Sequence, residues 1–140
     1  MFRTQIAILA FCVLSSFAFG SDVTVLRLKC VDRQEISYDD IYLEFEVDGQ
    51  KVDFGRKGPP GTSEKRTVNM TDGRVFSVPS EVLRRLTFKK TLTVYVFERD
   101  LGVNDTFGSM TIRNSGRTEK ALKGGRTGRK FEYRLEISVK

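Results

Sequence analysis

Apolar and polar residues alternate with a period of two over much of the chain after residue 20. The last segment shows this most clearly, because five apolar side chains alternate with polar ones over residues 131–140. Residues 23–31 and 41–47 follow the same pattern. Successive side chains of a strand point to opposite faces, so this pattern predicts half-buried β-strands.

The alternation also predicts which side chains face the core. In residues 41–47 the expected inward set is Ile41, Leu43, Phe45 and Val47, and the expected outward set is Tyr42, Glu44 and Glu46. Cys30 lies in line with Leu26 and Leu28 and is predicted to be a small buried hydrophobe. Arg27 and Lys29 fall on the opposite, outward face of the same strand.

Turn signals separate these segments. Asp48-Gly49 predicts a tight hairpin, because both central residues of a type I′ turn need positive φ. A second pair, Asp72-Gly73, joins residues 67–70 to residues 75–78. Residues 80–86 form the one helical candidate, a short connector with Ser80 as the expected N-cap and Glu81 in the first turn.

These elements predict an all-β fold. About seven or eight short antiparallel strands, with turn residues between them and no helical repeat, are typical of an antiparallel two-sheet β-sandwich. Residues 21–140 are enough for one domain with a single core.

The first twenty residues are laid out like a secretory signal peptide. Arg3 precedes an apolar run over residues 6–19, and Gly20 and Ser21 supply small residues at its exit. The run has fourteen residues, fewer than the roughly twenty that span a bilayer. We therefore expect cleavage near residue 20 and a secreted, extracellular domain that is not transmembrane.

Composition argues against most enzyme classes. The chain has no histidine, which removes the commonest general base and the commonest zinc ligand. Its two cysteines are Cys12, within the predicted signal, and Cys30, so the mature domain has no disulfide partner for Cys30. We expect a binding protein rather than an enzyme.

One stretch resembles a known family. Residues 92–100 (Leu-Thr-Val-Tyr-Val-Phe-Glu-Arg-Asp) and residues 104–108 (Asn-Asp-Thr-Phe-Gly) resemble the third calcium loop of the C2 domain, the membrane-targeting module of protein kinase C and synaptotagmin. In that family an apolar strand is followed by Asp-x-Asp, a short loop and Asn-Asp-x-Ile-Gly. Residues 37–43 resemble the segment that opens the family's second strand.

The resemblance implies an eight-stranded sandwich whose loops at one end bind calcium and bridge to anionic lipid headgroups. The implied calcium ligands are Glu35, Asp40, Glu98, Asp100 and Asp105. Calcium takes six to eight oxygen ligands, which carboxylates of separate loops can supply. The alternative is that these acids are solvated, or pair with Arg33, Lys51 and Arg99.

Charge is distributed unevenly along the chain. Residues 32–53 contain eight acids and two bases, whereas residues 113–140 contain nine bases and three acids. The basic part is interpreted as a Gly-rich loop before the last strand. Its candidate anion-binding residues are Lys123, Arg126, Arg129 and Lys130. They suit an anionic membrane surface or an extracellular polyanion, or they are simply a solvated hairpin loop.

Two further features bear on partners. Asn69 and Asn104 begin Asn-x-Thr tripeptides, the acceptor pattern for N-glycosylation. No recognition helix or aromatic-rich basic strand is apparent, so nucleic acid is not an expected partner. We therefore expect a secreted non-enzymatic module for anionic surfaces, with calcium as a possible cofactor. The alternative is a secreted protein-interaction module, such as an effector, inhibitor or toxin-like factor, that uses no metal.

Overall fold

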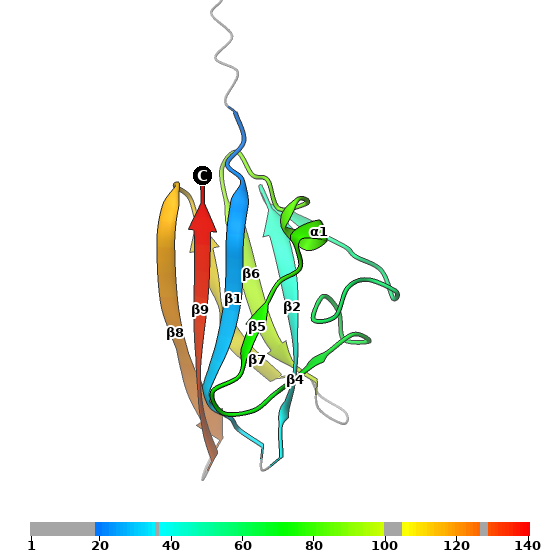
Figure 1. The fold of residues 1–140 in the computed structure, drawn as a ribbon, viewed down its shortest axis with the longest axis vertical. Coiled ribbons are helices and arrows are strands. Elements are labelled where there is room, and N and C mark those ends of the chain that lie inside the picture. Colours follow the sequence, from blue (N-terminus) through cyan, green and yellow to red (C-terminus); the bar gives the residue numbers. More distant parts are fainter. Residues whose placement is uncertain (1–18, 36, 100–104, 127–128) are drawn as a thin grey trace, which may run out of the picture.

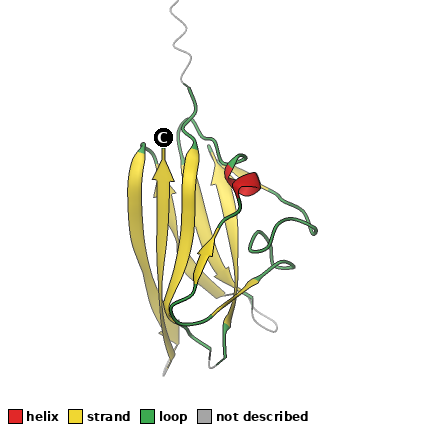
Figure 2. Ribbon diagram, viewed as in Figure 1, coloured by secondary structure: helices red, strands yellow, loops and turns green. Residues whose placement is uncertain are grey.

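The structure is a computed structural model that describes residues 19–35, 37–99, 105–126 and 129–140. The side chains of Asp105, Arg126 and Arg129 are outside that description, as are Asp100, Asn104 and most of the predicted signal peptide. The described residues form two antiparallel β-sheets packed face to face (Figures 1 and 2). The predicted all-β sandwich is confirmed.

Nine strands are described, more than the seven or eight expected. The four-stranded sheet has the order β5 (Val75–Ser77), β1 (Val23–Asp32), β9 (Arg129–Val139) and β8 (Gly116–Arg126). The five-stranded sheet has the order β3 (Gln50–Val52), β2 (Asp39–Val47), β6 (Leu92–Glu98) and β7 (Asp105–Ile112), with β4 (Val68–Met70) also paired to β2. Within the described residues, no helix is long and apolar enough to cross a bilayer.

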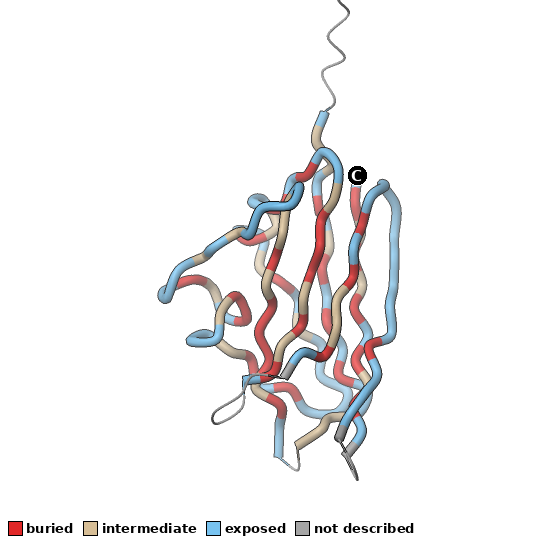
Figure 3. The backbone as a smooth tube through the Cα atoms, turned by 180° about the vertical axis from the view of Figure 1, so that it is seen from behind, coloured by how far each residue is buried: buried red, intermediate tan, exposed pale blue. Residues whose placement is uncertain are grey.

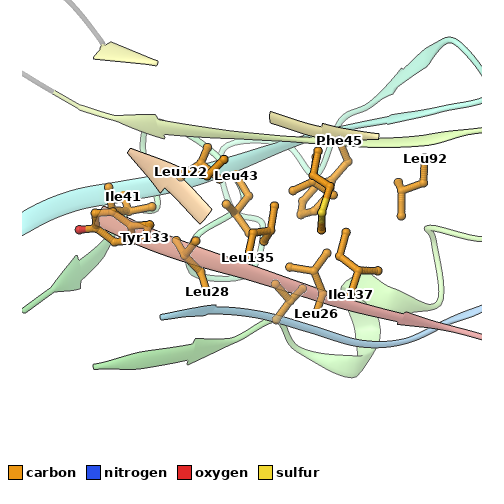
Figure 4. Packing of buried hydrophobic residues seen from close by; sticks show 14 of the residues in the cluster. Leu26, Leu28, Ile41, Leu43, Phe45, Leu92, Leu122, Tyr133, Leu135 and Ile137 are labelled. Atoms are coloured by element: carbon orange, nitrogen blue, oxygen red, sulfur yellow. The ribbon is translucent and has the colours of Figure 1, made fainter. Parts of the chain in front are cut away.

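The core lies between the sheets, where the inward positions of both meet (Figure 4). Leu43 and Phe45 of β2 pack opposite Leu135 and Ile137 of β9, and all four side chains are at most 1% exposed. Cys30 is fully buried in the same cluster, so its predicted role as a small hydrophobe is confirmed. Burial of each large apolar side chain contributes roughly 1.5–3 kcal/mol, and the single core therefore supplies the main driving force for folding.

The Asp48-Gly49 hairpin is confirmed. Asp48 and Gly49 have φ of 51° and 84°, and the turn joins Val47 of β2 directly to Gln50 of β3. The Asp48 carboxylate accepts the backbone N–H groups of Lys89, Lys90 and Thr91 at 2.6 to 3.1 Å. The turn residue therefore also fixes the chain as it enters β6.

The second Asp-Gly pair has a different role from the first. It links β4 of one sheet to β5 of the other, so it crosses the sandwich instead of closing a hairpin. Gly73 has φ of 81°, and the Arg74 N–H donates to the Thr71 carbonyl at 3.0 Å, as in a type II turn. Only one of the two central residues has positive φ, which explains the difference from Asp48-Gly49.

Two local predictions are wrong. The helix α1 (Ser80–Leu83) has Pro79 as its N-cap residue, and Ser80 provides no capping hydrogen bond. Tyr42 was expected to face solvent but is 4% exposed. It is covered because Phe97 lies opposite it on β6 and stacks on its ring, with centroids 5.2 Å apart.

The basic segment is a strand and not a loop. Residues 116–126 form β8, which pairs along its full length with β9. Its first half is exposed, as Figure 3 shows at the edge of the sandwich, and this explains why hydrophobic alternation did not predict it. Gly124 is required beside Phe131, because a Cβ at this position would lie 2.8 Å from the Phe131 ring.

The Asp48 interactions predict a pH-dependent effect on stability. The backbone N–H groups, first that of Lys89, lower the pKa of Asp48. This stabilisation is complete above the ordinary aspartate pKa of about 3.9 and is lost as the pH falls through the lowered folded-state value. The substitution Asp48→Asn, which the turn tolerates, should lower the urea midpoint at neutral pH, and the deficit should shrink in acid.

The control for this prediction is Asp53→Asn. The Asp53 carboxylate accepts one backbone N–H, that of Gly55, so a smaller deficit is expected. Equal deficits for the two variants, or a deficit for Asp48→Asn that does not change with pH, would contradict the assigned role.

Candidate functional site

Four of the five predicted calcium ligands, Glu35, Asp40, Glu98 and the backbone of Asp105, lie near one end of the sandwich, which we call the loop end. In Figure 1 this is the lower end, where β1, β6 and β8 finish and β2, β7 and β9 begin. The strand register confirms the arrangement, because Ile41 pairs with Glu98 and Glu98 pairs with Asp105. Asp40 and the end of β6 are therefore neighbours, as the family resemblance implies.

Asp40 already has a cationic partner at the loop end. The Arg99 guanidinium nitrogen Nη2 lies 3.0 Å from Asp40 Oδ2, and the Arg99 backbone N–H donates to the Asp40 carbonyl at 2.8 Å. Arg99 follows directly after β6, which places it beside the first residues of β2. The sequence predicted either calcium or an arginine or lysine such as Arg99 as the partner of these acids. In the structure the partner of Asp40 is Arg99.

The neighbouring Asp39 was missed as a key residue. It is fully buried, and its carboxylate accepts the backbone N–H groups of Gln34 at 3.0 Å and Glu35 at 2.8 Å. It also accepts the Tyr133 hydroxyl of the opposite sheet at 2.6 Å. The sequence did contain a signal for this role, because Asp39 occupies an inward-facing position in the alternation that continues with Ile41 and Leu43.

Tyr133 and Cys30 complete this buried polar group. Burial, with the hydrogen bond to Asp39 next in importance, raises the pKa of Tyr133 far above its ordinary range, so the phenol stays a neutral donor. Burial likewise raises the pKa of Cys30, which keeps its thiol protonated and unreactive. The group joins the two sheets and fixes the chain between β1 and β2.

The remaining predicted ligands that the structure describes, Glu35 and Glu98, do not belong to a metal-binding group of described residues. Glu35 is half-buried, and its backbone is bound to Asp39 and to Arg33 Nε. Glu98 is 1% exposed and lies on the inward alternation of β6. Asp100 and the side chain of Asp105 are outside the described residues. Among the described residues, no group of three or more potential ligands is placed to hold a metal.

Of the predicted anion-binding residues, Lys123 and Lys130 are exposed, and the backbones of Arg126 and Arg129 pair at the end of the β8–β9 hairpin. Cross-strand partners share a sheet face, so the register identifies the other cations on the outer face of the four-stranded sheet. We call this surface the basic face. Its cations are Arg27, Lys29, Arg117, Lys123, Lys130 and Arg134.

Three glutamates on the basic face are paired. Arg117 contacts Glu136 at 3.1 Å, Lys123 contacts Glu132 at 3.4 Å and Arg134 contacts Glu119 at 3.9 Å. Arg27 and Lys29 make no ion pair within the described residues, and both are exposed. A hollow of about 240 Å³ is lined by Arg27, Lys29, Val75, Glu119, Arg134 and Glu136. Sequence reasoning placed Arg27 and Lys29 outward but did not connect them to the basic segment.

The structure describes one of the two predicted glycosylation sites. Asn69 is exposed on the short strand β4, and its carbonyl accepts a hydrogen bond from the Arg74 guanidinium. Its side chain is therefore accessible to modification. Asn104 lies outside the described residues.

Comparisons with known proteins give likenesses to solved structures alone. No protein-family model matches the chain, and no curated protein matches it. A solved structure described as "Structure of a C2 domain" is 14% identical over 86% of this chain and 99% of that chain, with a TM-score of 0.41. A likeness of this size says nothing about a ligand or a site.

The Asp39 contacts predict a loss of stability in Tyr133→Phe. The substitution removes the hydroxyl donor and leaves a buried carboxylate oxygen with one hydrogen bond fewer, which costs about 1–3 kcal/mol of unfolding free energy. Urea unfolding measures the loss, and hydrogen exchange should show faster exchange at Gln34 and Glu35. Tyr95→Phe is the matched control, because Tyr95 is half-exposed. Equal stability of Tyr133→Phe and wild type would contradict this role for Asp39.

Proposed function

We propose that the chain is a secreted, non-enzymatic binding module for anionic surfaces and that the basic face makes the contact. The observation that carries the proposal is the exposed pair Arg27 and Lys29. They line a hollow with Arg134, on a face where each glutamate already has a cationic partner. Cations without a partner on a sheet face attract phosphate or sulfate groups.

The β8–β9 hairpin extends this surface toward the loop end. Lys130 lies opposite Gly125 near the tip, on the same side of the sheet as Lys123 and Glu132. Each cation held near an anionic membrane contributes about 1 kcal/mol, and the contributions fall off within a Debye length. A face with several cations therefore binds a multivalent anionic surface better than a single small anion.

The proposal includes export and removal of the first twenty residues. Backbone pairing of the described fold begins at Ser21, whose N–H donates to the Phe88 carbonyl at 2.7 Å. Asp22 exchanges two backbone hydrogen bonds with Lys140, each 3.0 Å long. Cleavage after Gly20 would leave all of these contacts in place.

We further propose that binding does not need calcium at Asp40. The Arg99 guanidinium neutralises this carboxylate, and a calcium ion there would have to displace it. Opposite charges at this distance attract by about 1 kcal/mol even in water, so displacement has a cost. Any calcium ligands at the loop end would therefore come from other carboxylates, with Glu35, Glu98, Asp100 and Asp105 the remaining candidates from the sequence.

The first test removes Arg27 and Lys29, which make no ion pair with a described residue. Arg27→Gln with Lys29→Gln should weaken binding to phosphatidylserine vesicles roughly 30-fold at low salt, since about 1 kcal/mol is lost per cation. Neutralising Lys123, Arg126, Arg129 and Lys130 should weaken it further. Vesicle sedimentation measures binding to phospholipid headgroups, and elution from immobilised heparin measures binding to an extracellular polyanion.

The control is Arg56→Gln with Lys57→Gln, which removes the same charge from the connection between β3 and β4, away from the basic face (Figure 1). It should change binding far less. Equal weakening by the two double variants would show that only net charge matters. That result would refute the proposal that the basic face makes the contact.

The second test concerns calcium. Vesicle binding by the wild type should be the same in calcium as in excess chelator. Any calcium-dependent rise in the thermal midpoint, which a ligand of the folded state produces by mass action, should be equal in Asp40→Asn and wild type. Asp40→Asn should behave like wild type. A calcium-dependent rise in the midpoint that Asp40→Asn abolishes would overturn this part of the proposal.

A further inference from the structure

The outer face of the five-stranded sheet differs in chemistry from the basic face on the other side of the sandwich. Figure 3 views the molecule from this side. Three aromatic rings follow one another across β2 and β6. Tyr42 stacks on Phe97 with centroids 5.2 Å apart, and Phe97 stacks on Tyr95 at 6.3 Å. Tyr42 is buried at one end of this row, whereas Tyr95 and Phe97 are half-exposed.

Carboxylates flank the aromatic row. A hollow of about 210 Å³ is lined by Glu44, Phe45, Glu46, Lys51, Tyr95 and Phe97. We call this surface the acidic aromatic face. Lys51 Nζ lies 2.9 Å from Glu44 Oε1, which neutralises one of the two glutamates. Glu46 makes no ion pair within the described part of the chain, so the hollow has one unneutralised negative charge.

We propose that the acidic aromatic face binds an arginine or lysine side chain from a basic segment of a partner protein. A cation over an aromatic ring is attracted by the negative ring face, and the nearby Glu46 carboxylate adds a Coulombic attraction. Tyr95 supplies the exposed ring, and the stacked Phe97 and Tyr42 hold it in place.

Charge complementarity favours this occupant over others. An anionic ligand would be repelled by Glu46. An apolar peptide would cover Glu46 and remove its water without supplying a donor, which costs free energy. A cationic side chain satisfies both the ring and the carboxylate. This proposal concerns a different surface from the proposed anionic-surface contact, so either one could fail while the other holds.

The test uses a fluorescent nona-arginine peptide and measures its affinity for the full domain by anisotropy. Tyr95→Leu keeps an apolar side chain but removes the ring, and Glu46→Gln removes the charge. Each should weaken peptide binding about 2- to 5-fold, the range expected for an exposed cation–π contact. Phe97→Leu gives a second measurement on the aromatic row should Tyr95→Leu fold poorly.

Matched controls exist elsewhere on the surface. Tyr38 is 44% exposed near the loop end and Glu81 is exposed in α1, so Tyr38→Leu and Glu81→Gln remove the same groups from other places. They should leave the affinity unchanged. Arg27→Gln with Lys29→Gln should not weaken peptide binding either, which separates this site from the basic face.

Two results would overturn the proposal. One is an equal effect of the site variants and their controls, which would indicate non-specific attraction. The other is concentration-dependent self-association of the free domain that Tyr95→Leu abolishes, measured by sedimentation equilibrium. That result would assign the face to the basic hairpin of a second copy and not to a separate partner.

Discussion

The buried hydrogen bond between Asp39 and Tyr133 is the interaction on which the loop end depends. It is the point where a polar group of the five-stranded sheet meets one of the four-stranded sheet inside the core. Because the same carboxylate accepts two backbone N–H groups of the chain between β1 and β2, sheet packing and loop shape are coupled. A buried acceptor of this kind is costly to leave unsatisfied, so the native pairing of the sheets is favoured over alternatives.

The two outer faces then follow from strand alternation. Each strand presents every second residue to solvent, so the cations of β1, β8 and β9 collect on one side and the glutamates of β2 on the other. The acidic and basic segments of the sequence thus give the two outer faces of the sandwich opposite charge. One domain can in this way offer unlike surfaces to an anionic surface and to a basic partner.

Most of the fold could be predicted from the sequence, and the failures have identifiable causes. Period-two alternation and the Asp48-Gly49 turn are local, so they predicted the core strands and the first hairpin. Strand β8 was missed because its exposed edge position leaves Leu122 as the one buried residue among residues 116–125. The loop-end grouping was anticipated through the family resemblance, and Arg99 was named as a possible partner of the acids. Which acid it pairs with depends on the β2–β6 register, which no local pattern encodes.

The Asp40–Arg99 pair also changes how an acidic loop end should be interpreted. Carboxylates that crowd at one end of a sandwich repel each other, and something positive must offset this repulsion. A bound ion is one solution, and a covalently attached guanidinium is another that needs no free ligand. Arg99 follows β6 and its backbone N–H donates to the Asp40 carbonyl, so the fold itself supplies the neutralising charge. A neighbouring cation that neutralises an acidic residue at the end of a β-sandwich therefore weakens the inference from that residue to a metal site.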